Sequence, residues 1–154
     1  MKLSKNLSLG EVTKSNTATR LGIDNTPNEK IIANLKQTAE CIFQPIREYF
    51  ECPIYISSGY RSPGLNRAIG GSETSEHCFG FALDIDQDNR NTPITNAMVF
   101  NMIKNYLEFN QLIWEFGDDT NPDWVHVSYQ KGNNKNKVLR AVRVDGKTSY
   151  LPFE

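Results

Sequence analysis

The stretch SEHCFGFALDID, residues 75–86, places a histidine seven positions before an aspartate inside an apolar segment. The alternation in its second half predicts a strand with its large apolar side chains on one face and Asp84 on the other. A carboxylate that is buried without a partner costs several kcal/mol. Asp84 should therefore have a partner, and we expect that partner to be a metal ion bound together with His77.

The second histidine lies in a similar segment. The chain has only two histidines, and His126 falls within DWVHVSY, residues 123–129, where it shares the polar face of an expected strand. A catalytic zinc site takes three protein ligands from His, Asp and Glu and leaves the fourth position to water. His77, Asp84 and His126 would supply such a set for one Zn²⁺ ion. The spacing alone leaves this interpretation and that of ordinary hydrogen-bonded side chains about equally open.

A hydrolytic metal site also needs a carboxylate that accepts the proton of the attacking water without binding the metal. Asp123 stands three residues before His126, at the edge of the same expected strand. We therefore expect Asp123 to be the general base. Glu115, in the segment IWEFG, is the competing acidic residue.

Length and composition limit the other possibilities. A chain of 154 residues predicts a single domain over 1–154, and the net charge of −1 gives no field that favours nucleic acid or an anionic membrane. No apolar run approaches the roughly 18 residues of a membrane span. The N-terminal segment has no apolar core and no cleavage site of a signal peptide. These features predict a cytoplasmic monomer without a signal peptide.

The periodicity of the chain predicts a mixture of helices and strands. In TPNE, Glu29 follows Thr26 as in a capping box, and an amphipathic pattern of about 20 residues follows, in which Pro45 should form a kink. A second helix is expected over 94–109 and a single helical turn after Ser62. The expected strands are 53–58, 81–86, 111–117, 124–129, 138–144 and 148–153. This order favours an α+β fold in which a mainly antiparallel sheet packs with helices.

Two segments resemble one known family. SGYRSPGLNRAIGGSETSEHCFGFALDID, residues 58–86, and the later DWVHVSY are similar to the zinc D,D-carboxypeptidase family of peptidoglycan peptidases, which shares its fold with Hedgehog-type signalling domains. The family includes D-alanyl-D-alanine carboxypeptidases and dipeptidases, and phage endolysins that cut the L-alanyl-D-glutamate bond. Its patterns S-x-H-x-x-G-x-A-x-D and D/E-x-x-H match Ser75, His77, Gly80, Ala82 and Asp84, then Asp123 and His126. The resemblance covers most of residues 8–130.

The resemblance implies a role for each matching residue. The implied zinc ligands are His77, Asp84 and His126. Asp123 would be the general base, and Arg61, which follows SGY, would lie near the scissile carbonyl or a substrate carboxylate. Ser75 would hydrogen-bond the substrate or orient the loop that carries the first histidine. Trp124 stands where some members have another histidine, so that aid to substrate binding is missing here.

The resemblance thus implies a zinc metallopeptidase acting on peptidoglycan stem peptides, as a D-Ala-D-Ala carboxypeptidase or an endolysin-like L-Ala-D-Glu endopeptidase. A phage holin could then release it to the cell wall. The alternative is a catalytically silent, zinc-stabilised binding or virion-associated module, against which the retained Asp123 argues, since a structural site needs no base. The C-terminal segment 137–153 carries no motif, and we expect it only to complete the sheet.

Overall fold

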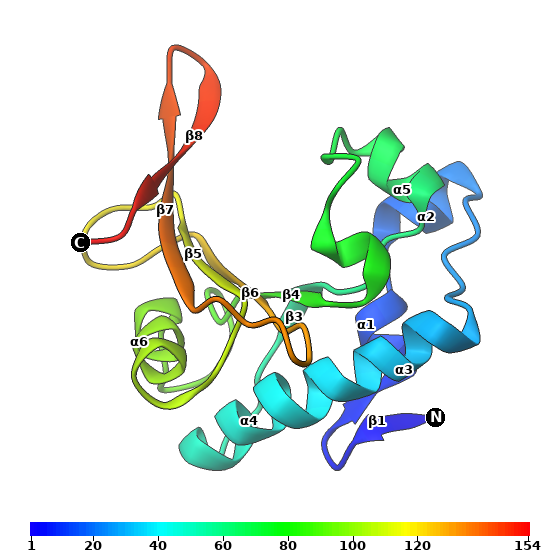
Figure 1. Cartoon of the computed structure of the whole chain (residues 1–154), viewed down its shortest axis with the longest axis horizontal. Helices are drawn as coiled ribbons and strands as arrows, with labels where there is room; N and C mark the ends of the chain where they lie inside the picture. The colour runs from blue at the N-terminus through cyan, green and yellow to red at the C-terminus, as the bar shows by residue number, and fades with distance from the viewer.

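A six-stranded sheet in the order β3-β4-β6-β5-β7-β8 forms the centre of the computed structural model, which describes residues 1–154 (Figure 1). Every neighbouring pair is antiparallel except β5 and β7, which run parallel. The predicted α+β class with a mainly antiparallel sheet is confirmed. The strands are β3 (Ile56–Ser58), β4 (Ala82–Ile85), β5 (Gln111–Glu115), β6 (Trp124–Ser128), β7 (Lys137–Val144) and β8 (Lys147–Pro152).

Helices cover one face of this sheet and flank one of its ends (Figure 1). None of them combines the length and the apolar character that crossing a membrane would require. A small hairpin of β1 (Lys2–Ser4) and β2 (Leu7–Ser8) precedes them. The helices are α1 (Leu9–Thr13), α2 (Asn16–Leu21), α3 (Glu29–Thr38), a π-helix (Ala39–Phe43), α4 (Gln44–Phe50), α5 (Pro63–Ala68), a 3₁₀-helix (Glu76–Phe79) and α6 (Asn96–Tyr106).

The first long helix differs from its prediction at two points. Its N-cap is Asn28, whose side-chain oxygen accepts a hydrogen bond from the Ile31 N–H at 2.9 Å, so the capping box expected at Thr26 is wrong. The expected disturbance at Pro45 takes the form of the π-helical turn just before it. Proline lacks an N–H and clashes with the preceding turn, and a wider turn accommodates such a residue without ending the helix.

Strand alternation separates a core face of the sheet from a polar face. On the core face, side chains of β4, β5 and β6 pack against α3, α4, the π-helix and α6 in one cluster of 22 buried apolar residues. Representative members are Leu83, Ile85, Leu112, Trp114, Val125, Val127, Ile42, Phe43, Val99 and Phe100. Because successive side chains of a strand point to opposite faces, Asp84, Glu115 and His126 must lie on the other face. This packing therefore fixes which face of the sheet can carry a site.

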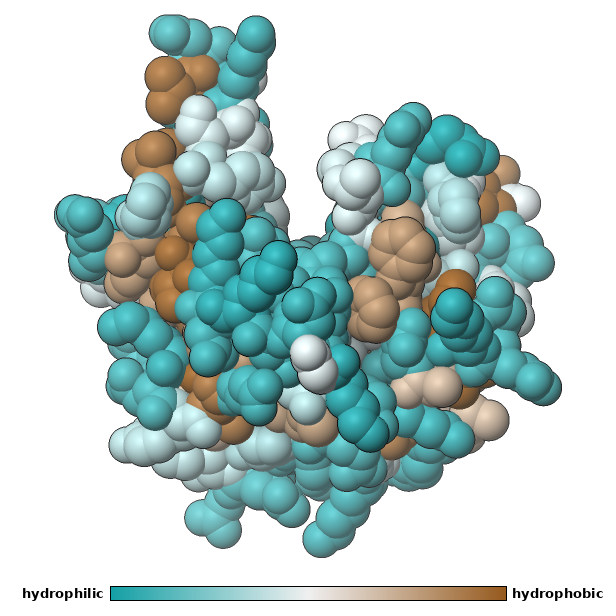
Figure 2. Space-filling model, in the orientation of Figure 1, coloured by the Kyte–Doolittle hydropathy of each residue, from teal (hydrophilic) through white to brown (hydrophobic).

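Two raised parts flank the polar face. The β7–β8 hairpin stands up at one end of the sheet, and α2 and α5 form a lobe at the other end (Figure 1). The space-filling view shows a hollow between them (Figure 2). The floor of this hollow is the polar face of the sheet.

Candidate functional site

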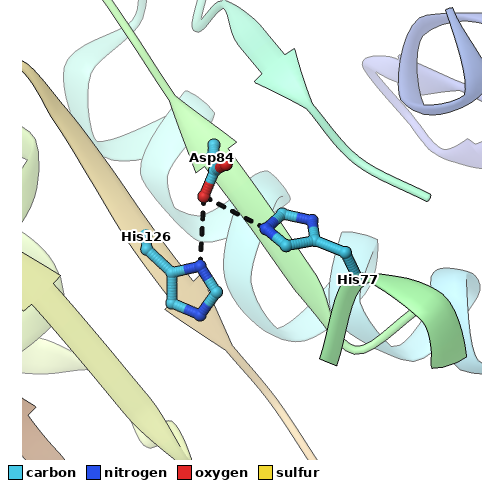
Figure 3. Close-up of side chains that lie close together, drawn as sticks. All are labelled: His77, Asp84 and His126. Carbon is cyan, nitrogen blue, oxygen red and sulfur yellow. Dashed lines mark hydrogen bonds and ion pairs between the residues drawn. The ribbon is translucent and has the colours of Figure 1, made fainter. Parts of the chain in front are cut away.

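The three predicted metal ligands come together on the polar face (Figure 3). Asp84 of β4 and His126 of β6 are direct partners in the antiparallel register, which puts their side chains side by side. His77 reaches the same point from the 3₁₀-helix that precedes β4. One ligand atom from each residue lies within 4.8 Å of the others.

The two distances from Asp84 to the histidines fit a tetrahedral metal ion. The Oδ1 atom of Asp84 lies 3.2 Å from Nε2 of His77 and 3.1 Å from Nδ1 of His126. Ligands that bind zinc at about 2.0–2.1 Å in a tetrahedron are about 3.3 Å apart. Nδ1 of His77 lies 2.7 Å from the carbonyl oxygen of Gly59 and must donate to it, so Nε2 turns a lone pair towards Asp84. The two imidazoles and the carboxylate thus converge, as a cation site requires.

Gly59 holds its carbonyl in position because the chain there is pressed against α1. A Cβ atom at Gly59 would lie 2.5 Å from the carbonyl oxygen of Val12. The same Val12 carbonyl accepts a hydrogen bond of 2.7 Å from the N–H of Tyr60. The glycine of the SGY segment is therefore required by this close approach, and the approach sets the orientation of His77.

A fourth residue, the acidic Glu76, lies behind the second histidine. Oε1 of Glu76 lies 3.8 Å from Nε2 of His126, a buried nitrogen that has no hydrogen-bond partner in the chain. Oε2 of Glu76 accepts hydrogen bonds from the side chains of Asn110 at 3.0 Å and Gln130 at 2.9 Å. A carboxylate behind a metal-binding histidine fixes the ring and raises its basicity. No sequence pattern pointed to Glu76, although it directly precedes His77.

The charges of the cluster oppose the cost of burial. Burial raises the pKa of Asp84, but the two histidines outweigh it and hold this pKa well below its usual range. Burial lowers the pKa of His126, but Asp84 and Glu76 outweigh it and raise the pKa to about 9. Burial raises the pKa of Glu76, but its hydrogen-bonding neighbours lower it to about 2. Without a metal, a proton on the His126 imidazole supplies the positive charge that Asp84 and Glu76 favour.

A cavity of about 810 Å³ lies above the cluster, and Arg61 and Ser75 both line it. The Arg61 guanidinium donates to Oγ of Ser75 at 3.4 Å, while its buried Nε has no partner in the chain. Oγ of Ser75 also accepts a hydrogen bond from the His77 N–H at 3.3 Å, which orients the loop of that histidine. A second cavity, of about 510 Å³, adjoins Arg61 and Asp84 on the side of α1 and β3. The candidate site is thus open on both sides.

The two candidate bases occupy different places. Glu115 lines the large cavity and is only 7% exposed. Burial raises its pKa to about 7, a shift that His126 partly offsets and Asp84 adds to. Asp123 directly precedes β6, is exposed, and does not line the cavity; its backbone N–H donates to the Glu115 carbonyl at 2.9 Å. The structure therefore brings Glu115 to the cluster, and the catalytic role of Asp123 stays a prediction.

Comparison with known proteins identifies the family. No curated protein sequence matches the chain. The sequence model of the family described as Peptidase M15 matches residues 5–128, which include all three clustered ligands, Arg61 and Ser75. This match confirms the resemblance seen in the sequence and supports a hydrolase of the metallopeptidase class. The chain belongs to the peptidase M15 family.

Proposed function

We propose that the protein is a zinc-dependent peptidase that hydrolyses a peptide bond in peptidoglycan stem peptides. One observation carries the proposal most directly. Three candidate metal-ligand side chains converge, with Oδ1 of Asp84 3.2 and 3.1 Å from the two imidazole nitrogens, on the floor of a cavity large enough for a peptide segment. The family match supports a peptidase acting on peptidoglycan in general.

Zinc would be held by His77, Asp84 and His126, and there it supplies a Lewis acid that polarises a carbonyl and lowers the pKa of water. Arg61 lines the same cavity with a guanidinium that has no acidic partner. A fixed positive charge in this place stabilises the negative charge that develops on the scissile carbonyl oxygen. Ser75 positions Arg61 through the hydrogen bond between them.

Glu115 fits the role of general base by its position. Its carboxylate would take a proton from the attacking water and pass it to the leaving amine. A carboxyl whose pKa lies close to the working pH suits both steps, and burial raises the pKa of Glu115 to about 7. Asp123, the residue expected from its spacing, is the alternative base. The variants Glu115→Gln and Asp123→Asn test which of the two carboxylates is the base.

The two cavities bear on which bond is cut. They meet at Arg61 and Asp84, so a bound peptide has room on both sides of the candidate metal position. A carboxypeptidase needs to hold little beyond the scissile bond on one side, whereas an endopeptidase holds chain on both. The arrangement favours endopeptidase cleavage, as at an L-Ala-D-Glu bond, over D-Ala-D-Ala carboxypeptidase cleavage. Release through a holin fits this activity.

A silent, zinc-stabilised module is the rival function. Structural zinc sites are closed by four protein ligands. Here three residues converge, and Glu76 lies behind the far nitrogen of His126. An open fourth position beside a buried carboxyl suits catalysis better than structural support.

The test combines metal analysis with digestion of purified peptidoglycan and mass spectrometry of the released fragments. We expect one zinc ion per chain and new stem-peptide ends that a chelator prevents. His126→Ala should lose both the zinc and the activity. Zinc bound at full occupancy without any released fragment, under conditions in which a known wall peptidase is active, would support the silent module instead.

A further inference from the structure

We propose that the β7–β8 hairpin is part of the substrate-binding site, in which Tyr150 and Arg143 bind a peptide segment that carries a free carboxylate. The inference rests on the proposed function for the identity of the peptide. The hairpin lies outside residues 5–128, the part of the chain that matches the family. It therefore adds a substrate contact beyond the shared part of the fold.

Strand register places Tyr150 over the site. Glu115 of β5 pairs with Ala141 of β7, and Ala141 pairs with Tyr150 of β8. Residues that are paired across neighbouring strands point to the same face, so Glu115 and Tyr150 lie in one row with the small, fully buried Ala141 between them. Tyr150 lines the large cavity, and its ring is more than half exposed.

The hydroxyl group of Tyr150 is free to bind a substrate. It makes no hydrogen bond within the chain, and burial, together with the charges of Glu115 and Asp84, raises its pKa. The hydroxyl therefore stays protonated at neutral pH and can donate a hydrogen bond. Phe116 and Trp124, whose ring centroids lie 5.5 Å apart, line the same cavity and give this end an aromatic surface.

Arg143 supplies the charge complementary to a carboxylate. It lies two residues beyond Ala141 on the same face of β7, is exposed, and lines the cavity. Its guanidinium lies 4.6 Å from the centroid of the Phe116 ring and makes no ion pair or hydrogen bond in the chain. By contrast Arg140, on the opposite face of β7, pairs with Asp119 at 2.7 Å. A planar guanidinium held on a ring and left unpaired is suited to bidentate binding of a carboxylate.

The arrangement of the hairpin also suits an extended ligand. It faces the lobe of α2 and α5 across the hollow above the metal-ligand cluster (Figures 1 and 2). Arg61 lies at the base of this hollow and Arg143 at its rim, both on the cavity surface. A peptide bound across the cluster would meet one guanidinium without an acidic partner at the reacting carbonyl and another further along its chain. Stem peptides carry free carboxylates that could occupy this second place.

The experiment measures binding separately from cleavage. Two non-hydrolysable stem-peptide analogues with ketomethylene linkages, one with free carboxylates and one with all carboxylates amidated, are titrated into the zinc-loaded protein. Trp124 lines the cavity, so tryptophan fluorescence can report binding. We expect the free carboxylates to improve affinity about tenfold and Arg143→Gln to abolish that preference. Tyr150→Phe should weaken binding of both analogues about threefold to tenfold, the effect of one hydrogen bond.

Arg140→Gln is the matched control, because it removes the same charge from the other face of the same strand and should keep the preference. If wild type does not discriminate between the analogues, or Arg143→Gln still discriminates, the inference is wrong. If wild type discriminates but cuts no natural stem peptide, the inference stands and the proposed function fails. If Arg143→Gln and Tyr150→Phe change the sedimentation mass of the protein but not its affinity for the peptide analogues, the hairpin is an interface between copies and the inference is wrong.

Discussion

Glu115 gives the most direct test of the electrostatics of the site, through the pH dependence of stability. This residue is 7% exposed, and its carboxyl makes no hydrogen bond in the chain. Burial, opposed by His126 and assisted by Asp84, raises its pKa from the ordinary 4.5 to about 7. A buried carboxyl without hydrogen bonds prefers to be neutral, so ionising Glu115 in the folded, metal-free protein costs free energy.

The sign and size of this cost follow from the two pKa values. Because the folded pKa is the higher one, the contribution of Glu115 to stability is present below about pH 4.5 and is lost as the pH rises through about 7. At about 1.4 kcal/mol per pH unit, the full loss is about 3 kcal/mol. Water entering the cavity would reduce this value, so about 3 kcal/mol is an upper limit. Glu115→Gln keeps the shape of the neutral side chain and cannot ionise.

We expect Glu115→Gln to raise the free energy of unfolding by less than about 1 kcal/mol at pH 5 and by up to about 3 kcal/mol at pH 8. The measurement is urea unfolding of chelator-treated protein at both pH values. Glu48→Gln, on an exposed part of α4, is the control for removing one surface charge. An equal effect of Glu115→Gln at pH 5 and pH 8 would refute the assignment of a raised pKa.

Three further outcomes are expected. Glu115→Gln should keep its zinc and lose about 100- to 10,000-fold in peptide cleavage, whereas Asp123→Asn should stay active; the reverse result would restore Asp123 as the base. Glu76→Gln should lower zinc affinity about 10- to 100-fold in competition with a chromophoric chelator, and an unchanged affinity would remove Glu76 from the site. Gly59→Ala should lower the melting temperature by several degrees, because its Cβ would lie 2.5 Å from the Val12 carbonyl oxygen; a melting curve equal to that of wild type would contradict this contact.

The convergence of the metal ligands could be predicted because it depends on local patterns. Alternation identified β4 and β6 as strands and put Asp84 and His126 on their polar faces, and the structure pairs these two residues directly. His77 lies only a few residues before β4, so the sequence already placed it near Asp84. With only two histidines in the chain, few combinations were available.

Other features depend on contacts that no local pattern contains. Glu76 is held by Asn110 and Gln130, which come from distant turns of the chain. Asn28 caps α3 in place of Thr26, and both residue types are favoured N-caps, so the local sequence did not distinguish them. The small elements before residue 22, which the periodicity did not predict, are too short to show a period.

The C-terminal segment shows the same limit in another way. We expected residues 137–153 only to complete the sheet, and β7 and β8 do extend it. Their alternation also turns Arg143 and Tyr150 to the face that carries the ligands. Which face a strand presents to a site depends on its partner strands, and the parallel pairing of β7 with β5 could not be read from the segment itself.

The geometry of the strands bears on the choice between the two acids. Asp123 lies in a bend just before β6, so the alternation of the strand does not place its side chain relative to His126. His126 is paired with Ile113 of β5, and Glu115 lies two residues further along β5, hence on the same face as His126. Glu115 also lines the cavity beside this histidine, whereas Asp123 is exposed and does not line it. The distance along the chain predicts Asp123, the pairing of β5 with β6 predicts Glu115, and the two amide variants decide between them.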